Sequence, residues 1–292
     1  MTFPDYFAPA TLDEALAKLG QQAGGAQIIA GGTDLLPRMR AGLVNPNLLV
    51  DLASLALAGI RRESSFVYLG ARVTHAQVLE SKLLRQHYPA LVVACEAIGG
   101  PSIRNRGTLG GNLVNASPAA DAAPPLLVYD ADLLLVSQGA ERCLPLADFF
   151  FGPGKTALAR DEILKEVRLP VPSGRTAAAF LKLGKRQAMA IAVVSVAVRL
   201  TLNQNSRIDQ ARIALGSVAP RPLRAMESEK VLLGRPLEKL PIVEAASVAA
   251  GEASPISDIR ASGDYRRRMV EVLVRRALSS ACQELQREKI GG

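Results

Sequence analysis

The chain has 292 residues, of which 49% are hydrophobic and 21% charged, with a formal net charge of +8. This length allows two domains with a core each, and the mixed composition without low-complexity tracts excludes a disordered chain. No apolar run reaches the roughly 20 residues that cross a bilayer, so no membrane span is expected. Residues 1–15 lack a basic start followed by an apolar block, so no secretory signal is expected there.

The cysteines and the basic residues argue against a metal site and against nucleic-acid binding. Cys95, Cys143 and Cys282 lie far apart, whereas disulfide frameworks, zinc sites and iron–sulfur sites need clustered thiols. We therefore expect a cytoplasmic chain that holds no metal itself. Basic residues are scattered, Trp is absent and only 4% of residues are aromatic, so base-stacking platforms are scarce. An acidic protein partner accounts equally well for the positive charge.

The first 55 residues form a small strand–helix–strand unit in this interpretation. Thr11 and Glu14 have capping-box spacing, and apolar residues follow at helical intervals. Residues 26–30 (AQIIA) and 48–52 are short apolar runs typical of strands.

A larger unit follows and ends at a proline-rich break. Thr74 and Gln77 open a helix by a second capping box, and residues 88–98 predict a buried helix. Strands are expected at residues 66–70, 132–137 and 162–169. Residues 170–174 (PVPSG) have the character of a linker.

The remaining third predicts antiparallel strands followed by helices. Strands are expected at 188–201 and 207–218, and helices at 226–233 and 241–250. The clearest element is the last helix, whose apolar face carries Met269, Leu273, Ala277, Ala281 and Leu285. This part has no glycine-rich loop, so we expect it to support a site rather than to bind the ligand directly.

Two glycine loops carry the functional signal: Gly31-Gly32-Thr33-Asp34 and Thr108-Leu109-Gly110-Gly111-Asn112. Each precedes an apolar stretch that predicts a helix. Exposed main-chain N–H groups at such a turn can hold an anion, and the following helix dipole favours it. Two such cradles in one domain predict a diphosphate held from both sides, and hence a dinucleotide.

The common nucleotide motifs do not fit. No GxGxxG follows the first strand, which excludes the Rossmann fingerprint. Residues 152–156 (GPGKT) imitate the end of a phosphate-binding P-loop, but Phe149 stands where the first glycine is required. ATP hydrolysis is therefore not expected.

Four segments in order resemble one family over nearly the whole chain. They are AGGTDLL at 30–36, TLGGNLVNASPAAD at 108–121, GPGKT at 152–156, and the tail ARIALGSVAPRPLRA at 211–225 with SDIRASGDYRRRMVEVLVRRAL at 257–278. Together they resemble the flavoprotein (medium) subunit of molybdenum hydroxylases, which include xanthine dehydrogenases and aerobic carbon monoxide dehydrogenases.

The resemblance implies an α+β fold in two domains. Residues 1–173 would be a two-subdomain FAD-binding domain of the vanillyl-alcohol oxidase (PCMH) type, divided near residues 55 and 56. Residues 178–286 would be a smaller C-terminal α+β domain in which helices pack on an antiparallel sheet.

The resemblance also implies a set of FAD contacts. The diphosphate would lie against Gly31, Gly32, Thr33 and Asp34 and against Thr108, Gly110 and Gly111, with Asn112 assisting. The other matching positions are Gln27, Ile28, Ile29, Ala30, Ile98, Asp121, Leu164, Lys182 and Ile191. Ile191 would lie near the isoalloxazine ring and Leu164 near the adenine, and Lys182 could stabilise negative charge on a reduced flavin. No catalytic residue is proposed.

Several residues keep plainer interpretations. Asp34 and Asp121 also suit helix starts or turns, and Lys182 suits a solvated charge. His75 and His87 have no ligand partners in the sequence pattern. Asp130 and Asp132 are too generic in position to be named an acid–base pair.

The chain departs from the family pattern in places. Ala190 stands where many relatives have Asp, so the charge beside the ring would differ. Neither glycine loop contains a histidine, so FAD should be bound non-covalently. Hydroxybenzoyl-CoA reductase subunits share a stretch like TDLLPRMRAGL at 33–43, but their cysteine-bearing insertion is missing from 115–121.

The expected function is electron transfer within a heterotrimer. A large subunit would carry the molybdenum cofactor and a small subunit two [2Fe–2S] clusters, and FAD here would pass their electrons to NAD, a quinone or oxygen. Three alternatives stay open: a hydroxybenzoyl-CoA reductase-like subunit, a self-contained FAD oxidoreductase, which would need a base near the ring, and a non-enzymatic basic binding module.

Overall fold

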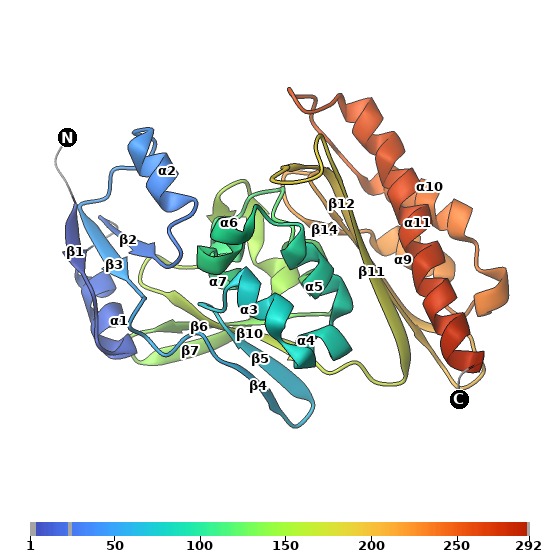
Figure 1. The fold of residues 1–292 in the computed structure, drawn as a ribbon, viewed down its shortest axis with the longest axis horizontal. Helices are drawn as coiled ribbons and strands as arrows, with labels where there is room; N and C mark the ends of the chain where they lie inside the picture. The colour runs from blue at the N-terminus through green and yellow to red at the C-terminus, as the bar shows by residue number, and fades with distance from the viewer. Residues whose placement is uncertain (1–3, 23–24, 291–292) are drawn as a thin grey trace.

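The computed structural model describes residues 4–22 and 25–290, and Figure 1 shows its layers in chain order. The first layer is a three-stranded parallel sheet of order β1-β3-β2. Its elements are β1 (Asp5–Phe7), α1 (Leu12–Gln21), β2 (Ala26–Ile29), α2 (Leu35–Arg40) and β3 (Leu48–Asp51). The predicted start of α1 is confirmed because Thr11 Oγ1 accepts the Glu14 N–H at 3.2 Å. The Glu14 carboxylate, however, accepts from Ala10 rather than from Thr11.

The second layer is a five-stranded antiparallel sheet of order β4-β5-β10-β6-β7 with helices on it. Its strands are β4 (Ile60–Glu63), β5 (Phe66–Gly70), β6 (Asp132–Ser137), β7 (Ala140–Pro145) and β10 (Ile163–Pro170). Its helices are α3 (His75–Glu80), α4 (Lys82–His87), α5 (Pro89–Glu96), α6 (Pro101–Arg106), α7 (Leu109–Val114), α8 (Ala123–Val128) and the short 3-10 helix η1 (Leu146–Asp148). The capping box at Thr74 and Gln77 is confirmed in both directions.

The third layer is a four-stranded antiparallel sheet of order β11-β12-β13-β14, covered by helices. Its elements are β11 (Arg175–Gly184), β12 (Ala192–Leu202), β13 (Ile208–Gly216), β14 (Leu223–Arg224), α9 (Met226–Leu232), η2 (Leu237–Lys239), α10 (Ile242–Glu252) and α11 (Gly263–Ile290). Figure 1 shows α10 and α11 lying along one face of this sheet. β12 begins later than predicted because Arg186 binds the Met189 carbonyl and closes residues 185–191 into a loop.

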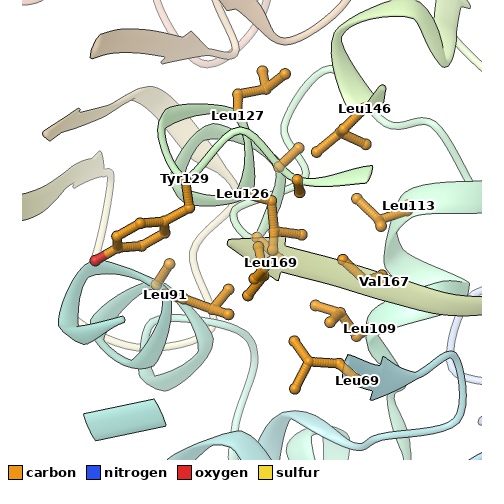
Figure 2. Close-up of a cluster of buried hydrophobic side chains, with 14 of the residues drawn as sticks. Leu69, Leu91, Leu109, Leu113, Leu126, Leu127, Tyr129, Leu146, Val167 and Leu169 are labelled. Carbon is orange, nitrogen blue, oxygen red and sulfur yellow. The ribbon is translucent and has the colours of Figure 1, made fainter. Parts of the chain in front are cut away.

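A buried core fixes the second glycine loop (Figure 2). Leu109 and Leu113 project from α7 into a cluster with Leu69 of β5 and Val167 of β10, and all four side chains are buried. Burying each such side chain contributes about 1.5–3 kcal/mol. Helix α7 is therefore fixed by its apolar face, and Gly111 is the exposed position of its first turn.

The GPGKT segment is a surface hairpin rather than a phosphate loop. It connects β8 (Phe150–Gly152) with β9 (Lys155–Thr156), and Gly154 has a left-handed φ of 67°. The Gly154 N–H donates to the Ala116 carbonyl at 3.1 Å, so the hairpin rests on the end of α7.

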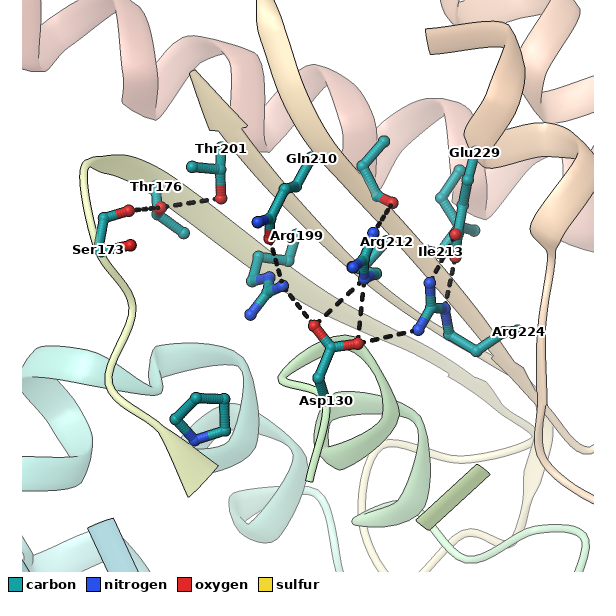
Figure 3. A network of polar contacts seen from close by, with 12 residues as sticks. Asp130, Ser173, Thr176, Arg199, Thr201, Gln210, Arg212, Ile213, Arg224 and Glu229 are labelled. Carbon is teal, nitrogen blue, oxygen red and sulfur yellow. Dashed lines mark hydrogen bonds and ion pairs between the residues drawn. The ribbon is translucent and has the colours of Figure 1, made fainter. Parts of the chain in front are cut away.

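Asp130 joins the second and third layers through three arginines (Figure 3). Its carboxylate accepts from Arg199 of β12 at 2.7 Å, from Arg212 of β13 at 3.0 Å and from Arg224 of β14 at 3.1 Å. Arg224 also donates two hydrogen bonds to Glu229 of α9, at 2.5 and 2.6 Å. Asp130 and its neighbour Asp132 thus have separate partners, since Asp132 pairs with Arg168.

Within 4–22 and 25–290, no helix combines the length and apolarity needed to cross a membrane. In the same ranges, no three His, Cys, Asp or Glu side chains group in a way that could hold a metal ion.

Candidate functional site

The two glycine loops meet at a backbone contact. A Cβ atom placed on Gly31 would lie 1.9 Å from the carbonyl oxygen of Arg106 and 3.1 Å from Cα of Gly107. Only glycine allows such an approach. The end of β2 and the segment leading into α7, which are far apart in sequence, therefore form one surface, as two cradles for one ligand require.

The first loop turns through Gly32, whose φ is 72°, into the short helix α2. The Gly32 carbonyl accepts from Leu36 at 3.0 Å. Asp34 stands at the N-cap position, but its exposed side chain makes no capping bond. Asp34 is therefore a helix-start residue by position, as one of its two interpretations had it, but its carboxylate does not cap α2.

In the second loop, the prediction of free main-chain N–H groups is wrong for residues 109–112. Leu109 donates to Val73 at 2.8 Å, and Gly110 donates to Ala71 at 2.9 Å. The N–H groups of Gly111 and Asn112 both donate to Thr108, to its Oγ1 and its carbonyl, at 3.0 Å each. Thr108 is the N-cap of α7, so the two glycines lie inside the first helical turn rather than before it.

The two glycines of this turn have different environments. A Cβ atom on Gly110 would lie 2.7 Å from the Ala71 carbonyl, so Gly110 is needed for packing. Gly111 is exposed, and a Cβ atom there would meet only Thr108 Oγ1, at 2.9 Å. The open side of the turn is therefore at Gly111.

Two buried oxygens nearby lack partners among the described residues, Asn112 Oδ1 and Asp121 Oδ1. Leaving a buried acceptor unpaired costs about 1–3 kcal/mol. A ligand that brings hydrogen-bond donors to this region would recover that energy. FAD carries amide, amine and ribitol hydroxyl donors along its length, so these orphaned acceptors fit it.

Lys182 and Asp121 form an ion pair between the second and third layers. Lys182 Nζ of β11 lies 2.6 Å from Asp121 Oδ2 and 2.9 Å from the Ala97 carbonyl. The side chains are only 10% and 8% exposed, so the interpretation of Lys182 as a solvated charge is wrong. The pair lies beside a cleft of about 420 Å³, lined by Ala97, Lys182, Leu183, Gly184, Lys185, Arg186, Gln187 and Ala190.

Burial raises the pKa of Asp121 to about 6, although the charge and hydrogen bond of Lys182 act in the opposite direction. The two effects agree with the geometry, because the ammonium reaches one carboxylate oxygen and the other is buried with no partner in the described part of the chain. Burial therefore favours the neutral form of this carboxyl, and the ion pair with Lys182 favours the charged form.

This pKa predicts a pH dependence of stability that Asp121→Asn should remove. Because the pKa rises from 3.8 in the unfolded chain to about 6 on folding, the contribution is fully present below 3.8 and lost as pH rises through 6. At 1.36 kcal/mol per pKa unit, the loss is at most about 3 kcal/mol. Urea denaturation from about pH 4.5 to about pH 7.5 should show this extra decline in the wild type alone. Parallel profiles for the two proteins would contradict the assignment.

The other predicted contacts divide into three groups. Ile98 is half-buried next to Ala97 of the cleft wall, and Ile191 is 65% exposed on the loop that borders the cleft. Gln27, Ile28, Ile29 and Ala30 lead along and out of β2 into the first glycine loop. Leu164 is different, because its side chain is buried in the core of the second layer opposite Leu135.

Sequence reasoning missed three residues around the loops. Arg38 Nη1 of α2 donates to Asn115 Oδ1 at 3.4 Å, which ties the helix of the first loop to the helix of the second. Arg104 binds the turn that precedes α6. His75 is buried against Gly107, and its Nδ1 has no hydrogen-bond partner within 4–22 and 25–290; burial, followed by the charge of Arg104, lowers its pKa to about 4. None of these contacts has a local sequence signal.

Two family models together match almost the whole chain. Residues 1–172 match the FAD binding domain in molybdopterin dehydrogenase, and residues 179–281 match the CO dehydrogenase flavoprotein C-terminal domain.

Two curated relatives show a similar span. The chain is 34% identical over 278 residues to the carbon monoxide dehydrogenase medium chain of Hydrogenophaga pseudoflava, covering 95% of this chain and 96% of that one. It is 33% identical over 282 residues to the xanthine dehydrogenase FAD-binding subunit of Escherichia coli O157:H7, covering 96% of each.

Solved structures agree in fold. Carbon monoxide dehydrogenase from Hydrogenophaga pseudoflava lacking the Mo-pyranopterin moiety matches with a TM-score of 0.93 and 33% identity, over 97% of this chain and 98% of that one. Quinoline 2-oxidoreductase from Pseudomonas putida 86 matches with a TM-score of 0.89 and 31% identity, over 98% and 99%. The predicted α+β fold, an FAD-binding domain followed by a smaller C-terminal domain, is confirmed. The chain belongs to the FAD-binding medium subunits of the molybdenum hydroxylases, the flavoprotein subunits of oxidoreductases of the carbon monoxide and xanthine dehydrogenase type.

Proposed function

We propose that this chain holds FAD between the joined glycine loops and the Lys182 cleft, and relays electrons through it within a molybdenum hydroxylase complex. The observation that carries the proposal is the buried Lys182–Asp121 pair, in which the cation lines the cleft and a carboxyl from the neighbouring layer holds it in place. A fixed cation favours negative charge beside it.

The proposed contacts follow the geometry of the site. Gly31, Gly32, Thr33 and Asp34 would take the diphosphate with Gly111 and the Asn112 side chain, next to Thr108 and Gly110. The ring would lie toward Ile98, Asp121, Lys182 and Ile191, and Gln27 to Ala30 and Leu164 would complete the site. Bound there non-covalently, FAD would supply the redox chemistry, since it can accept and donate electrons. The chain would position it and set the charge around it.

The partners are proposed from the same family membership. A large subunit would hold the molybdenum cofactor, a small subunit the [2Fe–2S] clusters, and NAD, a quinone or oxygen would be the external acceptor. We propose a cytoplasmic complex, which the three free cysteines support. We also propose domain limits of 1–173 and 178–286.

The proposal is tested in two stages. The purified chain should bind one FAD per chain in an absorbance titration, and a colourless protein that takes up none would contradict it. The complex with both partners, reduced by its substrate, should then reduce its flavin after its iron–sulfur clusters in rapid-mixing spectra. Substrate turnover by this chain alone would instead favour the self-contained oxidoreductase.

Gly111→Val is predicted to reduce FAD affinity at least tenfold while the chain stays folded. The new side chain would occupy the open side of the α7 turn, where the diphosphate is placed, and its Cβ atom would lie 2.9 Å from the Thr108 hydroxyl. Gly154→Ala is the matched control. It adds about 1–2 kcal/mol of strain at a positive φ, but nothing lies within 4 Å of the new atom. Full flavin content in Gly111→Val, or loss in Gly154→Ala, would show that the wrong loop was assigned.

A further inference from the structure

The turn between α5 and α6 gathers four consecutive carbonyl groups around two cations. Arg104 Nη1 lies 3.1 Å from the Glu96 oxygen, 3.2 Å from that of Ile98 and 3.5 Å from that of Gly99. Lys182 Nζ lies 2.9 Å from the oxygen between them, that of Ala97. One cation thus comes from α6 and the other from β11.

Such a cluster of carbonyls needs a cation at its centre. Three oxygens that converge on one nitrogen carry like partial charges, and these repel one another if the nitrogen is removed. The Glu96 carbonyl belongs to the end of α5, where a cation is favourable in any case. The oxygens of Ile98 and Gly99 lie beyond that helix, so a helix-capping role does not explain them.

The turn is also sterically fixed on its other sides. Gly99 has a φ of 51°, and a Cβ atom there would lie 2.7 Å from Ile103. A Cβ atom on Gly100 would lie 3.8 Å from the Met189 side chain, on the loop that borders the cleft. The turn carries Ala97, which lines the cleft, and Ile98, a proposed flavin contact. The conformation of the turn therefore sets the position of one wall of the cleft.

We propose that Arg104 is a positioning residue for the flavin ring: it gathers the carbonyls of Glu96, Ile98 and Gly99 so that this wall stays opposite Lys182. The inference rests on the proposed function, because it assumes that the ring lies in the Lys182 cleft. Without Arg104, the freed carbonyls compete with Asp121 for the Lys182 ammonium. The position of the wall and the position of the positive charge beside the ring would then both change.

The test compares FAD binding by the full chain and by Arg104→Ala. The Kd for FAD should rise at least tenfold. At saturating FAD, the visible circular dichroism of the flavin should differ from that of the wild type, because the ring meets a displaced wall. Millimolar ethylguanidinium should restore at least half of the lost affinity by filling the vacated carbonyl cluster.

Arg85→Ala is the matched control. Arg85 lies on α4, in the same layer as Arg104. Its Nε also donates to a backbone carbonyl, that of Leu79 at 2.6 Å. Its Kd for FAD should stay within twofold of the wild type. If Arg104→Ala does not fold, Arg104→Lys replaces it: the shorter side chain does not bring its ammonium to the place of Arg104 Nη1, so the Kd should still rise at least threefold.

Three results would overturn the inference. They are a wild-type Kd in Arg104→Ala, a wild-type Kd in Arg104→Lys where that variant is needed, and weakened binding with an unchanged flavin spectrum and no response to ethylguanidinium. Failure of the wild-type chain to bind any FAD is a different outcome, since it would contradict the proposed function itself.

Discussion

Asp130→Asn is expected to lower the free energy of unfolding by about 3 kcal/mol, the lower end of the range for breaking a buried ion pair. The substitution leaves the guanidinium groups of Arg199, Arg212 and Arg224 facing one another, and Glu229 pairs with Arg224 alone of the three. Arg199 is the costliest of them, because its side chain is 6% exposed and cannot turn into water. The Asp130 carboxylate is 36% exposed, so solvent screening keeps the loss from being larger.

The choice of asparagine isolates charge from backbone strain. Asp130 has a φ of 51°, a region that asparagine tolerates and alanine does not. Asp209→Asn makes the same charge change in a second cleft, which Asp130, Arg199 and Arg212 also line; Asp209 is exposed and takes no part in the three ion pairs of Asp130. Urea denaturation should therefore separate the two variants by at least about 2 kcal/mol. Equal stabilities would mean that Asp130 contributes no more than a surface charge.

In the same network, Arg212→Gln should recover part of the loss when it is added to Asp130→Asn. Removing one of three uncompensated cations relieves repulsion, so the double variant should be more stable than the sum of the single changes predicts. If the two stability changes were strictly additive, the arginines would not repel one another measurably when Asp130 is neutral.

Gly31→Ala is expected to lower FAD affinity at least a hundredfold. The added methyl would lie 1.9 Å from the Arg106 carbonyl oxygen and 2.7 Å from its carbon, and neither can move without shifting the peptide that leads into Thr108. The added methyl group would therefore push the two glycine loops apart. The third layer shares no atoms with this contact, so far-ultraviolet circular dichroism should remain close to that of the wild type.

Gly59→Ala supplies the comparison for that experiment. Gly59 is exposed, has an ordinary φ, and an added Cβ atom would meet nothing within 4 Å. Isothermal titration with FAD should give the wild-type Kd for Gly59→Ala and no measurable heat for Gly31→Ala. Normal binding by Gly31→Ala would show that the close approach of the two loops is not needed for the ligand.

Elements with strong local signals were predictable from sequence. The N-cap at Thr11, the capping box at Thr74, the long apolar stripe of α11 and the break at 170–174 all depend on neighbours within a few residues, and all appear in the structure. The position of the second glycine pair was mistaken by one helical turn. The Thr108 side chain accepts the Gly111 N–H and so caps α7. The sequence alone does not distinguish a glycine in a loop from a glycine in the first turn of a helix.

The contacts that build the site were beyond the sequence because they join distant segments. Lys182 and Asp121 were both named, yet their pairing spans 61 positions. Asp130 was set aside as generic in position, although arginines 69, 82 and 94 positions away converge on it. Arg104 was not singled out, because it binds backbone carbonyls, which every residue has and which therefore leave no signal in the sequence.

Because Lys182 reaches across the layers, the proposed FAD pocket needs residues of both the second and the third layer. Residues 1–172 contain both glycine loops and the Asp121 carboxyl, but the ammonium that meets this carboxyl lies ten positions beyond them. A shortened polypeptide could therefore fold its first two sheets and still present a half-built pocket. During synthesis, the pocket becomes whole only when the last sheet has folded back.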